Sequence, residues 1–464
     1  MTFALTLTPL PEGIGIYTSQ NDCQRNSPSP FVGEGRVGGK RGVAPHPHPD
    51  LPPSRGKEPL SLPEVGFEAC RYRCPQGEGI AEGPLRLSRD ADFHYRFDMS
   101  ANRPLDRRSK LLHRLKNQPA QTLLVSDKTN VSYLTGFTGD SSLLLIGPEI
   151  CTLISDGRYT TQISAECPGM NVYIRPQTET IIAAACRVLK KARLPKLAIE
   201  ADHLSVAAFE KIKAAVKGLE ACPTSGLVEE LRQIKDADEV AEIRVAIRQA
   251  EKGFEVLRAQ LRGDMTELAA AHLLEQAMRQ FGATRAAFPP IVAVGDRAAL
   301  PHGRPTTRAL SQADFVLIDW GALAPSGYHS DLTRLLVTGN ISPKLEKVYR
   351  VVLKAQQAAI RHLRPGVRSR DVDAVARRVI ENAGFGKHFS HGLGHGIGLN
   401  IHEAPRLSPA FETELIPGMV VTVEPGIYLE GWGGVRIEDD CLITRIGAEV
   451  LTGVPKEFAQ VIVD

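Results

Sequence analysis

The chain has 464 residues, and its 56 lysines and arginines nearly balance its 53 aspartates and glutamates, for a formal net charge of +3. This length allows two or three domains, and the charge balance argues against nucleic acid or a membrane surface as a partner. Apolar runs stay well short of the ~20 residues that a membrane span needs, and the start MTFALTLTPLPEG lacks the basic region and cleavage site of a signal peptide. The eight scattered cysteines indicate the reduced thiols of a cytoplasmic protein rather than a disulfide framework or a structural zinc site.

The first 98 residues differ from the rest of the chain. The stretch SPSPFVGEGRVGGKRGVAPHPHPDLPPSRGKEP is rich in Pro, Gly and Arg and has neither a helical nor a strand period. Such a segment cannot bury enough apolar area to offset its ordering entropy, so residues 1–98 are predicted to be a disordered extension. Met99 follows directly, and we also hypothesise that translation starts there, which an intact mass matching all 464 residues would contradict.

Residues 99–225 alternate helical and extended patterns, which predicts an α/β domain. The segments RRSKLLHRLKNQ, TETIIAAACRVLKKA and SVAAFEKIKAAV have the apolar spacing of helices, whereas QTLLVSD, SSLLLIG, CTLISDG and KLAIE have the composition of short strands. A segment of about 120 residues is long enough for an independent core.

Residues 226–464 open with a long amphipathic helix whose apolar residues recur at helical spacing: Val240, Ile243, Ile247, Ala250, Phe254 and Leu257. Asp236 is the expected N-cap, with Glu239 three residues further on as in a capping box. Further helices are predicted near residues 266–281, 343–363 and 369–383, and strands near 314–338 and 418–446. Helices that alternate with antiparallel hairpins predict an α+β domain.

Four acidic residues of this last domain belong to apolar strands: Asp319 and Glu424 are expected to end their strands, and Asp331 and Glu438 to lie within theirs. A hairpin through FVLIDWGALAPSGYHSDLTRLLV can bring the first two side by side. One such carboxylate alone is most often solvated, but four of them in apolar strands are costly, because each must be desolvated and like charges repel. Two divalent ions would balance the four negative charges, and water bound between them would ionise near neutral pH.

Three histidines accompany the acids. His391, His395 and His402 lie in HGLGHGIGLNIHEAP, interleaved with glycines that allow backbone to approach a crowded site. An isolated histidine is more often a core or capping residue than a ligand, but three in one glycine-rich loop favour a functional site. His302 in ALPHGRP cannot be interpreted by itself.

These residues resemble the pita-bread metallopeptidases, which include aminopeptidase P, prolidase and methionine aminopeptidase, over roughly residues 226–464. Residues 99–225 resemble the N-terminal domain shared by creatinase, prolidase and aminopeptidase P, through NVSYLTGFTGDSSLLLI and SDGRYTTQ. The resemblance implies a pita-bread catalytic domain that follows a creatinase-type α/β domain, whereas residues 1–98 have no counterpart in the family.

The resemblance implies five metal ligands, which occur here in the family's order: Asp319, Asp331, His395, Glu424 and Glu438. Asp331 and Glu438 would each bridge two divalent ions, and an oxygen-rich set with one histidine favours Mn²⁺, with Co²⁺ and Zn²⁺ as alternatives. The stretch between Asp319 and Asp331 is one residue longer than is usual in the family. We expect the hairpin tip at Ala324-Pro325-Ser326 to absorb it, because a one-residue slip would turn the Asp331 side chain to the other face.

The resemblance also implies catalytic groups around the metal ions. His391 and His402 would contact the substrate or the developing tetrahedral intermediate, and His302 would line the same pocket. Arg436 would pair with a carboxylate of the protein or of the substrate, and Glu424 would move a proton. The implied reaction is hydrolysis of the bond between an N-terminal residue and a following proline in a small peptide, by a homodimer or a higher homo-oligomer.

The sequence leaves several alternative functions open. Aminopeptidase P activity is slightly preferred to prolidase activity, and the two differ in whether the pocket admits a longer peptide or closes on a dipeptide carboxylate. A metal-free creatinase-like hydrolase and a non-catalytic binding protein are disfavoured, because both predict the loss of acidic ligands. Methionine aminopeptidase is disfavoured by the α/β domain, which those enzymes usually lack.

Overall fold

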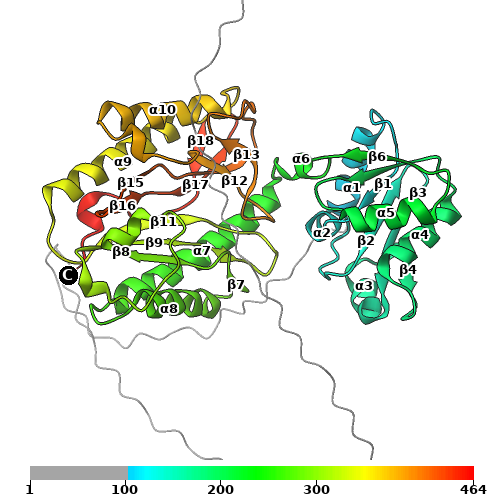
Figure 1. Ribbon diagram of the computed structural model, residues 1–464, viewed down its shortest axis with the longest axis horizontal. Coiled ribbons are helices and arrows are strands. Elements are labelled where there is room, and N and C mark those ends of the chain that lie inside the picture. Colours follow the sequence, from blue (N-terminus) through cyan, green and yellow to red (C-terminus); the bar gives the residue numbers. More distant parts are fainter. Residues whose placement is uncertain (1–102, 464) are drawn as a thin grey trace, which may run out of the picture. The chain divides into compact units, whose positions relative to one another are not determined.

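The computed structural model of the protein describes residues 103–463 (Figure 1). The predicted extension, residues 1–98, and the proposed start at Met99 lie outside the described residues. No helix within residues 103–463 combines the length and the apolar composition required to cross a bilayer. The five cysteines of this part of the chain are free thiols: Cys151, Cys167, Cys186, Cys222 and Cys441.

The first domain is built on a six-stranded sheet in the order β4-β3-β2-β1-β5-β6. Its strands are β1 (Leu123–Val125), β2 (Leu143–Gly147), β3 (Ile150–Asp156), β4 (Asn171–Arg175), β5 (Lys196–Glu200) and β6 (Glu220–Thr224). The first three pair antiparallel, and the other three join the sheet in parallel. The strands predicted from QTLLVSD, SSLLLIG, CTLISDG and KLAIE are therefore confirmed.

Helices provide the packing partners for two apolar cores of this sheet. One core takes apolar residues from α1 (Arg103–Leu115), α2 (Lys128–Thr135) and α3 (Thr160–Glu166), and the other from α4 (Ile181–Ala192) and α5 (Val206–Ala215). The predicted helices correspond to α1, α4 and α5. Helices α2 and α3 were not predicted, because helices of seven or eight residues show too few turns for a clear apolar period.

The second domain places its sheets between two pairs of helices (Figure 1). After the short α6 (Glu229–Arg232), one pair is α7 (Ala237–Gln260) with α8 (Glu267–Gln280), and the other is α9 (Pro343–His362) with α10 (Ser369–Asn382). Asp236 caps α7 in the expected capping box, because its side chain accepts from the Glu239 backbone and the Glu239 side chain accepts from the Asp236 backbone. All four helices were predicted within two residues.

The strands of the second domain form four antiparallel groups: β11-β9-β8, β13-β12-β14-β17-β18, β15-β16 and β10-β7. Their bounds are β7 (Arg285–Ala286), β8 (Ile291–Val294), β9 (Phe315–Trp320), β10 (Ala322–Leu323), β11 (Leu332–Val337), β12 (Gly394–Gly396), β13 (Glu403–Leu407), β14 (Val420–Val423), β15 (Gly426–Leu429), β16 (Gly433–Arg436), β17 (Asp439–Ile443) and β18 (Ala448–Val450). Antiparallel sheets covered by helices confirm the predicted α+β class.

The hairpin between β9 and β11 brings its two aspartates to one side. Thr333 pairs with Asp319, and Asp331 lies two residues before Thr333, so the side chains of all three share a face. The chain turns at residues 324–327, where Gly327 adopts a φ of +89° and donates its N–H to the carbonyl of Ala324 at 2.9 Å. The chain thus turns at the expected tip, and the Asp331 side chain lies on the same face as Asp319.

Two of the acids lie at the junction of two sheets. The β11 strand belongs to the three-stranded sheet and β17 to the five-stranded sheet, and they meet at an isolated bridge between Thr333 and Glu438. The expectation that Asp331 and Glu438 lie within strands was wrong by one residue, since each immediately precedes its strand. Both carboxylates therefore lie where regular pairing gives way to the junction.

Candidate metal centre and active site

The predicted site residues converge on one cavity of about 640 Å³ in the second domain. Its wall includes His302, Asp319, Asp331, His391, His395, His402, Glu424 and Glu438. Arg436 lies behind this wall, in contact with Asp319. The wall also includes apolar and basic residues that the sequence analysis did not select: Phe288, Pro289, Pro290, Ile291, Arg304, Ile401, Arg406 and Phe411.

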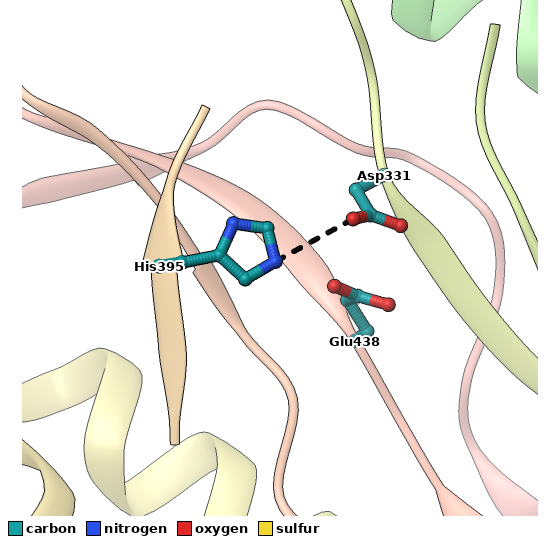
Figure 2. A group of neighbouring side chains, drawn as sticks. All are labelled: Asp331, His395 and Glu438. Atoms are coloured by element: carbon teal, nitrogen blue, oxygen red, sulfur yellow. Dashed lines mark ion pairs between the residues drawn. The ribbon is translucent and has the colours of Figure 1, made fainter. Parts of the chain in front are cut away.

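Asp331, His395 and Glu438 form the centre of the acidic cluster. One ligand atom from each lies within 4.8 Å of the other two, and all three side chains are buried. Figure 2 shows the imidazole of His395 pointing from β12 toward both carboxylates. Its Nε2 lies 3.6 Å from Asp331 Oδ2 and 3.4 Å from Oε1 of Glu424, which directly follows β14. Three carboxylates and one imidazole thus face a common point.

The orientation of His395 is fixed by its backbone surroundings. Its Nδ1 lies 3.1 Å from the Gly396 carbonyl oxygen, so this nitrogen carries the proton and leaves the Nε2 lone pair for a ligand. Glycines on both sides allow β12 to fit between its neighbours. A Cβ on Gly394 would lie 2.0 Å from the Thr422 carbonyl oxygen, and one on Gly396 would lie 2.2 Å from that of Ala404. Close backbone approach therefore requires glycine at both positions.

Arg436 connects the two ends of the cluster. Its guanidinium donates to Asp319 Oδ2 at 2.5 Å, to the Tyr428 hydroxyl at 2.8 Å and to Thr333 Oγ1 at 3.1 Å. The Thr333 hydroxyl in turn donates to Glu438 Oε2 at 2.6 Å. One buried arginine therefore orients Asp319 directly and Glu438 through a single hydroxyl.

The electrostatics of the cluster favour a bound cation. Burial, together with the negative charges around them, raises the pKa of Asp331 and of Glu438 well above the usual range. Burial also raises the pKa of Glu424 to about 8, and raises that of Asp319 although Arg436 opposes the shift. Asp319 Oδ1 is buried and finds no hydrogen-bond partner within residues 103–463. Carboxylates that are this costly to ionise, with a free oxygen and an imidazole lone pair beside them, fit a divalent metal site.

Tyr428 fixes the tautomer of His391. The Nδ1 of His391 lies 2.8 Å from the Gly392 carbonyl oxygen and must donate to it, while Nε2 lies 2.9 Å from the Tyr428 hydroxyl. Because the Tyr428 oxygen accepts from Arg436, its own proton is free to donate to Nε2. Burial lowers the pKa of His391 to about 4, which keeps the ring neutral. Both ring nitrogens are engaged, so a substrate contact through Nε2 has to displace the Tyr428 hydroxyl.

The other two histidines are more accessible. His302 and His402 are exposed residues of the cavity wall, and the His402 ring stands edge-on to that of His395, with 4.4 Å between centroids. Burial lowers the pKa of the His395 imidazole to about 3. The neutral His395 ring is therefore available as a ligand, while His402 lies beside it at the accessible side of the cluster.

Thr333 and Tyr428 are polar groups of the site that sequence analysis missed. A signal for Thr333 was present, because it lies two residues after Asp331 in a strand and so shares its face. Tyr428 gave no comparable signal, since its partner His391 is 37 residues away in the chain.

A cavity whose wall combines three buried carboxylates and one half-buried carboxylate with a correctly oriented imidazole defines a metal-dependent hydrolase. The comparisons with known proteins identify the family. The model of Metallopeptidase family M24 matches residues 241–445, and the model of the Creatinase/Prolidase N-terminal domain matches residues 107–234. The chain belongs to metallopeptidase family M24, as the resemblance in the sequence indicated, and carries the creatinase-type domain before the catalytic one.

Relatives that align with this chain over nearly their whole length agree with this family assignment. A putative dipeptidase of Bacillus subtilis, YkvY, is 37% identical and aligns over 74% of this chain and 96% of its own. The solved structure of an Xaa-Pro dipeptidase from Bacillus anthracis is 38% identical, covers 77% of this chain and 99% of its own, and superposes with a TM-score of 0.74. An X-Pro aminopeptidase from Thermotoga maritima is 35% identical, with coverage of 73% and 96% and a TM-score of 0.67.

Proposed function

We propose that this metallopeptidase hydrolyses the peptide bond between an N-terminal residue and a following proline. The observation that carries the proposal is the convergence of Asp319, Asp331, His395, Glu424 and Glu438 on one cavity. Peptidases named for the Xaa-Pro bond among the relatives support this choice of substrate. A metal-free or purely binding role is disfavoured, since no member of the acidic set is missing.

We assign the five residues as ligands of two divalent ions. Asp331 and Glu438 face each other across the sheet junction and would bridge the pair, while Asp319 and Glu424 would each hold one ion. The oxygen-rich set favours Mn²⁺, with Co²⁺ and Zn²⁺ as alternatives. When bound, such a pair supplies Lewis-acid polarisation of the scissile carbonyl and a water acidified to near neutral pH.

The chain's own groups would orient the substrate and move protons. Glu424, at the edge of the cluster beside His395, is our candidate for carrying a proton from the attacking water to the leaving proline nitrogen. His302 and His402, on the accessible side of the cavity wall, would contact the substrate backbone. His391 lines the cavity and would contact the substrate or the developing tetrahedral intermediate, once the Tyr428 hydroxyl that donates to its Nε2 is displaced.

Within this activity, we now favour dipeptides as substrates. Arg304 and Arg406 line the cavity, and a guanidinium is well matched to the free carboxylate of a dipeptide. The dipeptidases among the relatives agree with this choice. Aminopeptidase activity on longer peptides, which the sequence analysis preferred, remains the second candidate and is supported by the likeness to the Thermotoga maritima enzyme.

The test is hydrolysis by the full chain after chelation and after rescue with Mn²⁺, Co²⁺ or Zn²⁺. Substrates are Xaa-Pro dipeptides and Xaa-Pro-Xaa tripeptides, with Xaa-Ala peptides as the control for proline specificity. Cleavage of dipeptides alone supports the dipeptidase, and equal cleavage of tripeptides supports the aminopeptidase. Cleavage that survives chelation, or that ignores proline, contradicts the proposal.

Two further proposals concern the setting of the enzyme. Free thiols at all five described cysteines support a reducing compartment, and we propose the cytoplasm. We also propose a homodimer or a higher homo-oligomer, on the basis of the family resemblance, and light scattering on the purified chain measures it directly.

A further inference from the structure

A buried polar network lies directly behind the bridging carboxylates, on the side away from the cavity. The network begins at the Thr333–Glu438 bridge, where the sheets that carry Asp331 and Glu438 meet. The backbone contributes one hydrogen bond there, from Glu438 N–H to the Thr333 carbonyl at 3.2 Å. The separation of the two carboxylates therefore depends on side-chain contacts that cross-link the sheets.

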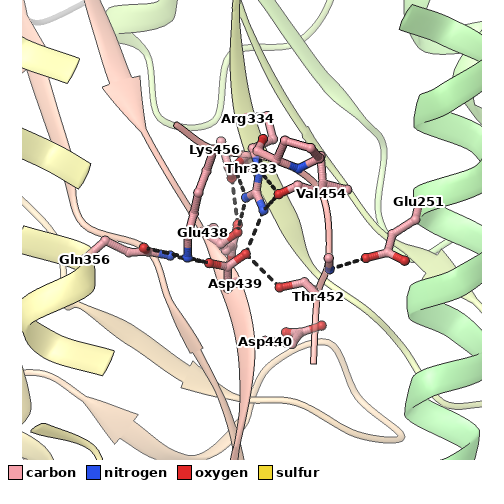
Figure 3. A network of polar contacts seen from close by, with 12 residues as sticks. Glu251, Thr333, Arg334, Gln356, Glu438, Asp439, Asp440, Thr452, Val454 and Lys456 are labelled. Atoms are coloured by element: carbon pink, nitrogen blue, oxygen red, sulfur yellow. Dashed lines mark hydrogen bonds and ion pairs between the residues drawn. The ribbon is translucent and has the colours of Figure 1, made fainter. Parts of the chain in front are cut away.

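Arg334 provides the first cross-link, from β11 to β17 (Figure 3). Because side chains alternate along a strand, Arg334 points away from the metal face that Thr333 occupies. Its Nη1 donates to the carbonyl oxygens of Thr333 at 2.9 Å and Glu438 at 2.5 Å, and its Nη2 donates to Asp439 Oδ1 at 2.7 Å. With only 1% of its surface exposed, Arg334 holds the backbone of a predicted bridging ligand from behind.

The same guanidinium is held by the C-terminal segment, residues 452–456. Nη2 also donates to the Val454 carbonyl at 2.6 Å, and Nε to those of Val454 and Pro455 at 3.2 and 3.3 Å. Asp439 accepts from Thr452 at 2.7 Å and from Gln356 at 2.6 Å, and it forms an ion pair with Lys456. Figure 3 shows Gln356 and Lys456 reaching Asp439 from one side and Thr452 from the other.

Asp440 provides a second cross-link in the opposite direction. Its Oδ2 accepts from the backbone N–H of Asp331 at 3.1 Å, so β17 holds the residue that leads into β11. Three consecutive residues thus have complementary contacts: Glu438 faces the cavity, Asp439 binds Arg334, and Asp440 binds Asp331.

We propose that Arg334, Asp439 and residues 452–456 set the spacing of the two sheets at the metal centre, which makes Arg334 and Lys456 positioning residues for the bridging carboxylates. The proposal rests on the assignment of Asp331 and Glu438 as bridging ligands. A bridging carboxylate must reach two ions at once. A small change in sheet spacing should therefore lower the affinity for the second ion more than the affinity for the first. Outer groups that orient metal ligands typically contribute about 10- to 100-fold to metal affinity.

The first test variant is Arg334→Lys, which keeps the charge but loses the forked donors, and its control is Arg350→Lys on the exposed face of α9. The second test variant is Lys456→Met, and its control is Lys354→Met, also on α9. Metal-stripped proteins are titrated with Mn²⁺ by calorimetry, and the exchange-coupled EPR signal of the Mn²⁺ pair is recorded. We expect Arg334→Lys to bind the first Mn²⁺ normally and the second about 10- to 100-fold more weakly, with loss of the coupled signal. Lys456→Met should show the same pattern to a smaller extent.

The proposal would be overturned if Arg334→Lys lowered the melting temperature but kept both Mn²⁺ affinities within twofold of wild type. The network would then have a purely structural role. If Arg334→Lys does not fold, the same Mn²⁺ titrations of Lys456→Met and Thr452→Val test the proposal. These two changes alter the segment 452–456 and leave the Arg334 guanidinium in place. Wild-type protein that binds two Mn²⁺ but does not cleave Xaa-Pro bonds would contradict the proposed function alone, since the affinities are measured without substrate.

Discussion

Replacement of Tyr428 by phenylalanine tests the hydrogen-bond chain that runs from Arg436 to His391. The change removes one oxygen from a buried position and keeps the ring. The Tyr428 hydroxyl lies 2.8 Å from Arg436 Nη1 and 2.9 Å from His391 Nε2, and Tyr428 is only 8% exposed. Both partners would lose their hydrogen bond in a place that water reaches poorly.

The size of the effect follows from these two lost contacts. A buried polar group left without a partner costs about 1–3 kcal/mol. If that loss falls on the transition state, kcat/KM for an Xaa-Pro dipeptide should fall by about 5- to 150-fold. Most of the decrease should appear in kcat, because Tyr428 orients His391, which we expect to contact the tetrahedral intermediate that forms only during the reaction.

The assay is steady-state hydrolysis of an Xaa-Pro dipeptide by the Mn²⁺-loaded full chain, together with a Mn²⁺ titration. Tyr428 is not one of the proposed ligands, so the Mn²⁺ affinity should stay within about threefold of wild type. Tyr173→Phe is the matched control, since it loses a hydroxyl contact of 3.1 Å to Glu179 in the first domain. A kcat/KM for Tyr428→Phe within twofold of wild type would refute the role given to the hydroxyl.

Three further predictions follow from individual contacts. Asp331→Ala and Glu438→Ala should each lower kcat by at least about 1,000-fold and reduce the amount of bound Mn²⁺ measured by metal analysis. Glu346→Gln on α9 is the control, and near-normal turnover of either alanine variant would contradict the bridging assignment. Thr333→Val keeps the shape but removes the hydroxyl contacts to Glu438 and Arg436, so Mn²⁺ should bind about 10-fold more weakly, whereas Thr224→Val in the first domain should leave the titration unchanged. Burial would raise the pKa of Glu403, but the positive charges of Lys235 and Arg232 outweigh burial and hold this pKa at about 2. The Glu403 carboxylate therefore contributes about 3 kcal/mol of stability above pH 4.5, which is lost as the pH falls toward 2. Glu403→Gln should therefore have a lower urea midpoint of unfolding than wild type at pH 7 and nearly the same midpoint at pH 2.5. An equal difference between the two midpoints at both pH values would argue against the ion pairs.

Local patterns in the sequence predicted most of the secondary structure of the second domain. The amphipathic period and the Asp236–Glu239 capping box placed α7, and similar periods placed α8, α9 and α10. These features depend on residues three or four positions apart, so the chain carries them without its tertiary context. Strand ends were predicted less accurately. Asp331 and Glu438 lie just outside the strands in which we expected them, because their strands diverge into different sheets.

The sequence by itself determined which residue types could hold metal ions and in what order they occur, because carboxylates in apolar strands and histidines among glycines are visible one by one. Only the tertiary structure decided that they share a cavity, and which groups hold them there. Thr333 and Glu438 are 105 residues apart in the chain, as are Arg334 and Asp439, and the contact of Tyr428 with His391 crosses 37 residues. Such contacts leave no periodic trace in the chain, since they arise where separate sheets meet and depend on side-chain direction at each end.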